Sequence, residues 1–197
     1  MRLSIITINR NNAAGLEKTM QSVAKQTYKE FEYIVVDGAS TDNSVEVIQQ
    51  YATKFAHLKW VSEPDSGIYN AMNKGIQMAT GEYIQILNSA DCLTNEKVVE
   101  CMLNAVDEKG HPSILYGNMI KCFEDGRRLT DKCFAGQDIT MLGMYVGTLN
   151  HDPAYIRREL FENTATMTNN LKSCRTGNGI CKPLSWVEKS PNMLIWT

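Results

Sequence analysis

Four short apolar runs in this 197-residue sequence lead into polar or acidic residues that could bind a ligand or take part in catalysis. Thr7 and Asn9 lie at the end of the first run, Asp37 ends the second, Asp65 follows the third and Asp91 follows the fourth. Carboxylates repel phosphate groups unless a divalent cation lies between them, and Mg²⁺ or Mn²⁺ bridges carboxylate oxygens to substrate phosphates in this way. The pattern therefore predicts group transfer from a nucleotide-activated donor, with a cation stabilising the departing diphosphate.

The apolar runs alternate with segments of helical periodicity. We expect strands over residues 3–8 and 31–38, around Trp60 and Val61, and over 82–88, and helices over 15–26, 40–55 and 68–79. This alternation is typical of an α/β protein with a mainly parallel sheet and helices on both faces. Right-handed crossovers place the carboxyl ends of all its strands at one edge, where such sheets bind ligands. One acidic residue after a strand often serves only as a turn residue or helix cap, but polar or acidic residues at four strand ends on one edge favour a site.

The absence of several patterns excludes or disfavours whole classes of function. No GxxxxGK[ST] loop follows a strand, and GxGxxG is missing, which disfavours ATPases and dinucleotide-dependent dehydrogenases. A net charge of −2 offers no basic surface, so we expect no nucleic-acid partner. The apolar runs are too short for a membrane span or a signal peptide. We therefore expect a cytoplasmic protein, with peripheral contact to the inner face of the membrane as an open alternative.

Four ordered motifs carry a family resemblance. The segments SIITINRNN, YIVVDGASTDNS, SEPDSGIYNAMNKGI and GEYIQILNSAD are similar to those of the family 2 inverting glycosyltransferases, especially members that build bacterial surface polysaccharides. The resemblance covers residues 2–162. It implies a Rossmann-like nucleotide-diphospho-sugar transferase fold, in which a nucleotide-binding half is joined to an acceptor-binding half. It also implies transfer of a sugar, with inversion, from a nucleoside-diphosphate donor (a UDP-sugar is favoured) to a hydroxyl of a glycan or lipid-linked acceptor.

Carried onto this sequence, the resemblance assigns the donor-binding residues. Thr7 and Asn9 would lie beside the nucleotide, and Asp37 would hydrogen-bond the base. Asp65 and Lys74 would line the diphosphate and ribose side of the site.

The same resemblance makes Asp91 the ligand of a Mg²⁺ or Mn²⁺ cofactor. The sequence departs from the family here, because many relatives have more acidic residues where this chain has Asn88, Ser89 and Ala90. We therefore expect weak metal affinity, with the nucleotide phosphates supplying most of the ligands. His151 resembles the family's acceptor-side histidine, although an isolated histidine is just as often purely structural.

The chain changes character after Glu162. Residues 163–197 are rich in Asn, Thr and Ser and show little periodicity, so we expect a poorly ordered segment outside a glycosyltransferase domain of residues 1–162. The codons of this segment also permit, in one alternative reading frame, a sequence containing KYGHYDE and SDW. That sequence resembles what family members have after the RRELF segment. We therefore expect a frameshifted or truncated chain with an incomplete acceptor half.

Loss of that half would remove the catalytic base. Inverting transfer needs a carboxylate that takes the proton of the acceptor hydroxyl, and the resemblance implies that an Asp of the acceptor half supplies it. Asp152 is only a weak substitute, so no catalytic residue is assigned and we expect donor binding with little or no turnover. A non-catalytic nucleotide-sugar-binding module remains the main alternative. A nucleotidyltransferase is disfavoured, because INRNNAAG lacks a glycine-rich basic loop after the first strand.

Overall fold

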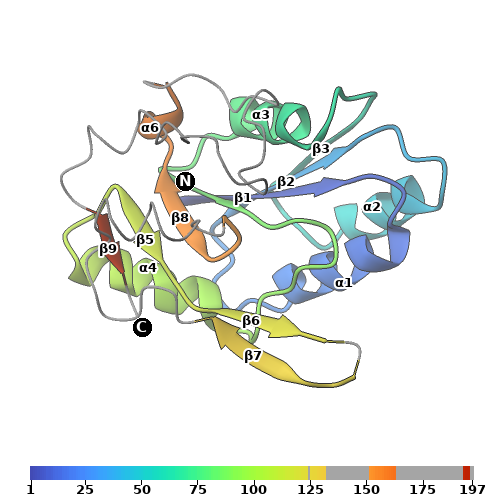
Figure 1. The fold of residues 1–197 in the computed structure, drawn as a ribbon. Helices are drawn as coiled ribbons and strands as arrows, with labels where there is room; N and C mark the ends of the chain where they lie inside the picture. The colour runs from blue at the N-terminus through green and yellow to red at the C-terminus, as the bar shows by residue number, and fades with distance from the viewer. Residues whose placement is uncertain (124, 132–150, 163–192, 196–197) are drawn as a thin grey trace, which may run out of the picture.

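The computed structural model describes residues 1–123, 125–131, 151–162 and 193–195 (Figure 1). Their strands are β1 (Leu3–Asn9), β2 (Glu32–Asp37), β3 (Leu58–Ser62), β4 (Tyr83–Ile86), β5 (Ile114–Tyr116), β6 (Met119–Cys122), β7 (Arg128–Asp131), β8 (Ala154–Arg157) and β9 (Met193–Ile195). Their helices are α1 (Ala13–Ala24), α2 (Ser44–Ala52), α3 (Ile68–Met78), α4 (Val98–Glu108) and α6 (Glu159–Glu162). None of the helices in these ranges is long and apolar enough to cross a membrane.

The described strands form one large sheet of order β3-β2-β1-β4-β8-β5-β9 and a separate hairpin of β6 and β7. Strands β3, β2, β1 and β4 are mutually parallel, and β9 is parallel to β5. The predicted α/β class with a mainly parallel sheet is thus confirmed. The sequence pattern did not predict β8, which runs antiparallel between β4 and β5. Because of this direction, the residues just before β8 lie at the carboxyl edge of β4.

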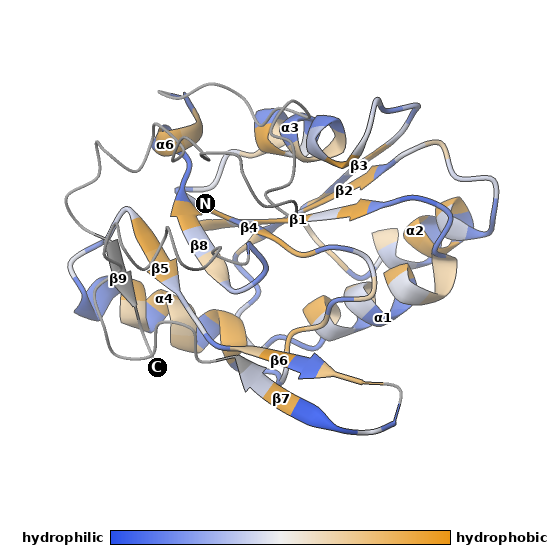
Figure 2. Ribbon diagram, in the orientation of Figure 1, coloured by the Kyte–Doolittle hydropathy of each residue, from blue (hydrophilic) through white to orange (hydrophobic). Residues whose placement is uncertain are grey.

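Helices cover both faces of the sheet. Helices α1, α2 and α4 lie on one face, and α3 and α6 lie on the other (Figure 1). Alternate residues of β1 serve the two layers, since Leu3 and Ile5 pack in the cluster under α1 whereas Ile6 and Ile8 pack in the cluster under α3. The inner helix stripes and the strands are correspondingly apolar, while the outer helix surfaces are polar (Figure 2).

Helix α3 lies unusually close to β1. A Cβ added at Gly75 would lie 2.4 Å from Cγ2 of Ile6, so the absence of a side chain there permits the approach. The close approach packs the second half of α3 against the middle of β1.

The segment after Glu162 is described only in part. Residues 163–192 and 196–197, which make up most of the segment that we expect to be poorly ordered, lie outside the described ranges. The expected frameshift concerns the same segment. Residues 193–195 form β9 and pair with β5 at the edge of the sheet.

Candidate functional site

A buried hydrogen-bond network joins the carboxyl ends of three neighbouring strands. Asn9 and Asp37 are partners in the register of β1 and β2, and Asn9 Nδ2 donates to Asp37 Oδ1 at 2.9 Å and to Ser44 Oγ at 2.9 Å. At the end of β3, Ser62 Oγ donates to Asp37 Oδ2 at 2.7 Å. Asp37 therefore holds together the edge at which the site lies.

The carboxylate of Asp37 is fully occupied by protein donors. Its side chain is buried, and it also accepts hydrogen bonds from the backbone N of Ser40 at 2.9 Å and from Ser40 Oγ at 2.5 Å. Burial would by itself raise the pKa of Asp37, but the bonds from Ser40, Ser62 and Asn9 together hold it below its ordinary value. The charged group thus shapes the loop after β2, and its predicted contact with a nucleotide base stays a prediction.

Two other predicted donor-site residues lie beside the site rather than in its cavity. Thr7 is buried within the sheet, with Oγ1 3.1 Å from the hydroxyl of Tyr33. Lys74 Nζ donates to the carbonyl O of Pro64 at 2.8 Å and pairs with Glu63 at 2.8 Å. Thr7 is therefore placed to support the strand ends from within, and Lys74 is placed to hold the loop between β3 and α3.

A cavity of about 290 Å³ lies at this edge. Its lining comes from the end of β1, the loop before α3, α3 itself and the segment after β4: Ile8, Asn9, Arg10, Asp65, Gly67, Ile68, Ala71, Asn88 and Ser89. The side chain of Asp65 is 6% exposed, and its Oδ1 accepts a hydrogen bond from the backbone N of Gly67 at 2.9 Å. Its Oδ2 lies only 2.3 Å from where a Cβ on Gly38 would be. The missing side chain of Gly38 thus leaves room for the Asp65 carboxylate.

Arg10 is a site residue that the sequence analysis did not select. It lines the cavity, it is the cation among the lining residues, and its Nη1 lies 3.9 Å from Asp65 Oδ1. Its side chain is 65% exposed, so it is free to meet an anionic ligand. Its position in the sequence could have indicated this role. Arg10 directly follows the first strand, at the edge of the sheet where phosphate binding is predicted.

A second group of polar side chains forms where β4 ends and the chain enters β8. Asn88 Nδ2 lies 2.8 Å from His151 Nε2 and 3.2 Å from Asp152 Oδ1. His151 Nε2 is 3.3 Å from the same Asp152 oxygen. The side chain of Asp91 contacts both Asn88 and Asp152. The structure therefore brings the predicted metal ligand and the predicted acceptor-side histidine together, although 60 positions separate them in the sequence.

The environment of Asp91 is short of positive charge. Burial, followed by the neighbouring Asp152 carboxylate, raises the pKa of Asp91 to about 6. Two carboxylates in contact are stabilised when a cation lies between them, so the residues present fit a divalent cation. Within the described ranges, no three His, Cys, Asp or Glu side chains form a metal site by themselves. A cation here therefore needs further ligands, such as substrate phosphates and water.

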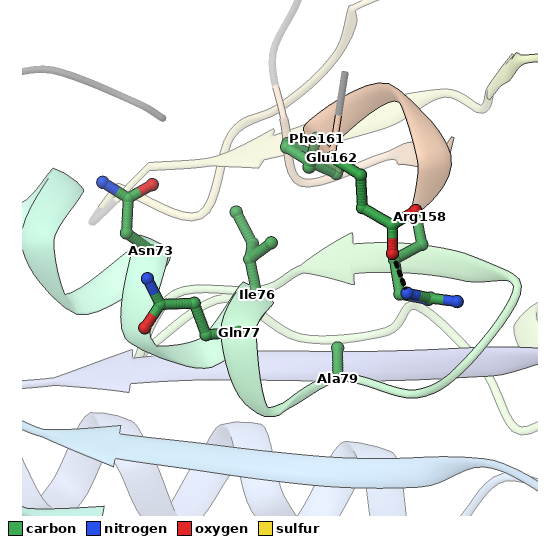
Figure 3. A pocket seen from close by; sticks show the side chains of 7 residues that line it. All are labelled: Asn73, Ile76, Gln77, Ala79, Arg158, Phe161 and Glu162. Atoms are coloured by element: carbon green, nitrogen blue, oxygen red, sulfur yellow. Dashed lines mark hydrogen bonds and ion pairs between the residues drawn. The ribbon is translucent and has the colours of Figure 1, made fainter. Parts of the chain in front are cut away.

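A second cavity, of about 240 Å³, lies between α3 and α6 (Figure 3). It is lined by Asn73, Ile76, Gln77, Ala79, Arg158, Phe161 and Glu162. Arg158 pairs with Glu162, and the backbone N of Arg158 donates to the carbonyl O of Glu82, just before β4. This cavity is thus at the amino end of β4, away from the predicted site residues.

The fold has solved counterparts among sugar transferases. Staphylococcus aureus TarS residues 1–349, in complex with UDP, superimposes with a TM-score of 0.74 at 26% identity over 88% of this chain and 52% of that one. The mannosyltransferase PcManGT from Pyrobaculum calidifontis, in complex with GDP-Man and Mn²⁺, gives 0.63 at 19% identity over 84% and 48%. Fold and site together define a nucleotide-sugar transferase architecture.

The sequence comparison identifies the family. Residues 4–165 match the model of glycosyl transferase family 2, and the chain belongs to that family. An uncharacterized glycosyltransferase of Mycobacterium tuberculosis is 41% identical over 116 residues, which is 58% of this chain and 44% of the relative. A PGL/p-HBAD biosynthesis glycosyltransferase of Mycobacterium bovis is 29% identical over 160 residues, 80% of this chain and 60% of the relative. The chain thus spans about half the length of these relatives.

Proposed function

We propose that this chain is the donor-binding half of an inverting glycosyltransferase that takes its sugar from a nucleoside diphosphate, with UDP favoured as the nucleotide. The observation that carries the proposal is the 290 Å³ cavity at the carboxyl edge of the parallel strands, which combines a seated carboxylate, Asp65, with an exposed cation, Arg10. TarS, the 26% identical neighbour, was solved with UDP. The acceptor is a hydroxyl of a glycan or lipid-linked molecule in surface polysaccharide synthesis, reached from the cytoplasm at the inner face of the membrane.

The residues divide into those that meet the donor and those that position them. Asp65 would accept hydrogen bonds from donor hydroxyls, and Asn9 would line the nucleotide. Asp37 acts as a positioning residue through Asn9, and Lys74 acts through the loop that carries Asp65. Thr7 supports the strand beneath them.

A divalent cation, Mg²⁺ or Mn²⁺, would be held by Asp91. When bound, such a cation neutralises the charge that develops on the diphosphate leaving group. His151 lies on the acceptor side of this carboxylate, and Asn88 fixes its ring by hydrogen bonding.

We further propose that residues 1–162 are the donor-binding domain, and that the chain binds donor but turns it over slowly or not at all. Transfer with inversion needs a base on the acceptor side, and Asp152, the acidic side chain next to His151, is engaged with Asn88 and Asp91. The alternative, a nucleotide-sugar-binding module without catalysis, also predicts that the chain binds the donor.

Calorimetry with UDP, with and without Mn²⁺, tests the binding half of the proposal. We expect saturable binding that Mn²⁺ tightens, and an absence of binding in both conditions would refute it. Release of UDP from UDP-GlcNAc and of GDP from GDP-mannose, followed with time, tests the catalytic half. Slow release with tight binding is the expected result, whereas turnover at rates like those of a full-length relative would overturn the proposed loss of activity.

A further inference from the structure

Side chains from two distant segments meet at the side-chain amide nitrogen of Asn88. Nε2 of His151 lies 2.8 Å away and Oδ1 of Asp152 lies 3.2 Å away, while the backbone N of Asp91 donates to the carbonyl O of Asn88 at 3.0 Å. The side chain of Asn88 thus links the segment after β4, which carries Asp91, to the segment before β8, which carries Asp152.

The charges around this point are not balanced by protein cations. The carboxyl groups of Asp91 and Asp152 lie close to each other. In the part of the chain that the structure describes, neither carboxylate forms an ion pair with a lysine or arginine, and Asp152 has only the imidazole of His151 at 3.3 Å. Two carboxylates this close repel each other, and a divalent cation bound between them would remove the repulsion.

The chain order explains where the second carboxylate comes from. The segment after β4 carries only Asp91, because Asn88, Ser89 and Ala90 stand at the preceding positions. Strand β8 is antiparallel to β4, so the residues that enter it meet the carboxyl end of β4. Asp152 thereby reaches Asp91 from 61 positions further along the chain.

Resting on the proposed function, we propose that the carboxylate of Asp152 is the second protein ligand of the divalent cation at Asp91. The cation site is then assembled from two segments, one leaving β4 and one entering β8, and Asn88 aligns both carboxylates. Binding of the cation joins the donor side of the molecule to the segment before β8 that carries His151. With two protein ligands, and water at its remaining positions, the cation can bind before the nucleotide.

Titration of the full chain with Mn²⁺ alone at pH 7.5, with free Mn²⁺ followed by electron paramagnetic resonance, tests this assignment. We expect one site in the unmodified protein, and we expect Asp152→Asn and Asp91→Asn each to weaken it by about tenfold or more. Asp125→Asn removes an exposed carboxylate that pairs with Arg127 on the hairpin and should leave the affinity unchanged. Asp152→Glu, which keeps the carboxylate, should retain most of the binding.

Thermal unfolding provides a second readout that does not depend on activity. Mn²⁺ should raise the Tm of the unmodified chain but not that of Asp152→Asn, and without Mn²⁺ this variant should be at least as stable because one repelling charge is gone. Unchanged Mn²⁺ affinity in Asp152→Asn, even with lost turnover, would overturn the assignment and point to Asp152 as a base. An absence of Mn²⁺ binding to the unmodified protein would also overturn it. Calorimetry with UDP in EDTA separates these outcomes from failure of the proposed function, which predicts nucleotide binding in either case.

Discussion

At the scale of single residues, the site depends on which acidic groups are occupied by the protein and which are available to a ligand. Asp37 is buried and satisfied by donors from three strand ends, so its charge serves the architecture. Asp65 lines the cavity, with Gly67 as its close donor and Arg10 at 3.9 Å. Both are acidic residues at strand ends, but only Asp65 lines the cavity.

Gly38→Ala tests whether the position of the Asp65 carboxylate matters for donor binding. The added Cβ would lie 2.3 Å from Asp65 Oδ2, so the carboxylate must move, while the backbone of Gly38 is in a region open to alanine. Loss of one hydrogen bond to a charged group corresponds to about 2 kcal/mol, and we therefore expect UDP affinity to fall by about tenfold or more with little change in Tm. Calorimetry measures the first quantity and thermal unfolding the second.

Gly117→Ala is the matched control, because its Cβ would meet Sδ of Met102 at an ordinary 3.4 Å, outside the cavity. If Gly38→Ala bound UDP as tightly as the unmodified chain, the position of the Asp65 carboxylate would not affect donor affinity.

At the scale of elements, a second buried carboxylate joins strands at the opposite edge of the sheet. Glu32, at the start of β2, accepts hydrogen bonds from Ser4 Oγ of β1 at 2.7 Å and from the backbone N of Thr80 at 2.8 Å, and it pairs with Lys59 of β3. Burial would raise the pKa of Glu32, but the bonds from Lys59, Ser4 and Thr80 together hold it below its ordinary value. Glu32 thus stabilises the amino ends of the strands as Asp37 stabilises the carboxyl ends.

Glu32→Gln should lower the free energy of unfolding at pH 7 by about 2 kcal/mol, because hydrogen bonds to a charged acceptor are lost. A carboxyl whose pKa is lowered by folding stabilises the protein above its ordinary pKa, and this stabilisation is lost as the pH falls through the folded value. The difference between the unmodified chain and the variant should therefore shrink between pH 5 and pH 3. Urea unfolding at pH 7, 5 and 3 measures it.

Glu17→Gln, on the exposed face of α1, should show no comparable difference at any of these pH values. A Glu32→Gln difference that stayed constant down to pH 3 would contradict the role of the charge.

At the scale of the whole molecule, the donor cavity and strand β9 belong to different parts of the large sheet. The lining residues of the cavity lie between positions 8 and 89, next to β1, β3 and β4. Strand β9 is at the other end of the strand order, beyond β8 and β5. The donor site and β9 are therefore expected to be energetically independent.

A chain ending after Glu162 should bind UDP with an affinity within about a factor of two of the full chain, because distant sites contribute independently. Calorimetry on both proteins measures this, and circular dichroism confirms that the shorter chain is folded. A much weaker affinity in a folded shorter chain would show that the last residues contribute to the donor site.

The sequence by itself determined the alternation of strands and helices, and with it the edge at which Asn9, Asp65 and Asp91 collect. This information is contained in the local sequence, because buried strands appear as short apolar runs. Right-handed crossovers then place the carboxyl ends of the strands at one edge. The four polar strand ends and the nucleotide-sugar chemistry followed from the same pattern and from the motifs that carry the family.

Only the tertiary structure decided which of these residues face the cavity and which further residues complete the candidate site. Asp37 turns inward because three strand ends supply donors to it, and this depends on the register between β1, β2 and β3. Asp152 meets Asp91 because β8 runs against its neighbours, a direction that depends on long-range pairing rather than on local periodicity. Arg10 is identified as a site residue by its position in the wall of the cavity. In the sequence alone, a single basic residue after a strand cannot be distinguished from an ordinary surface residue.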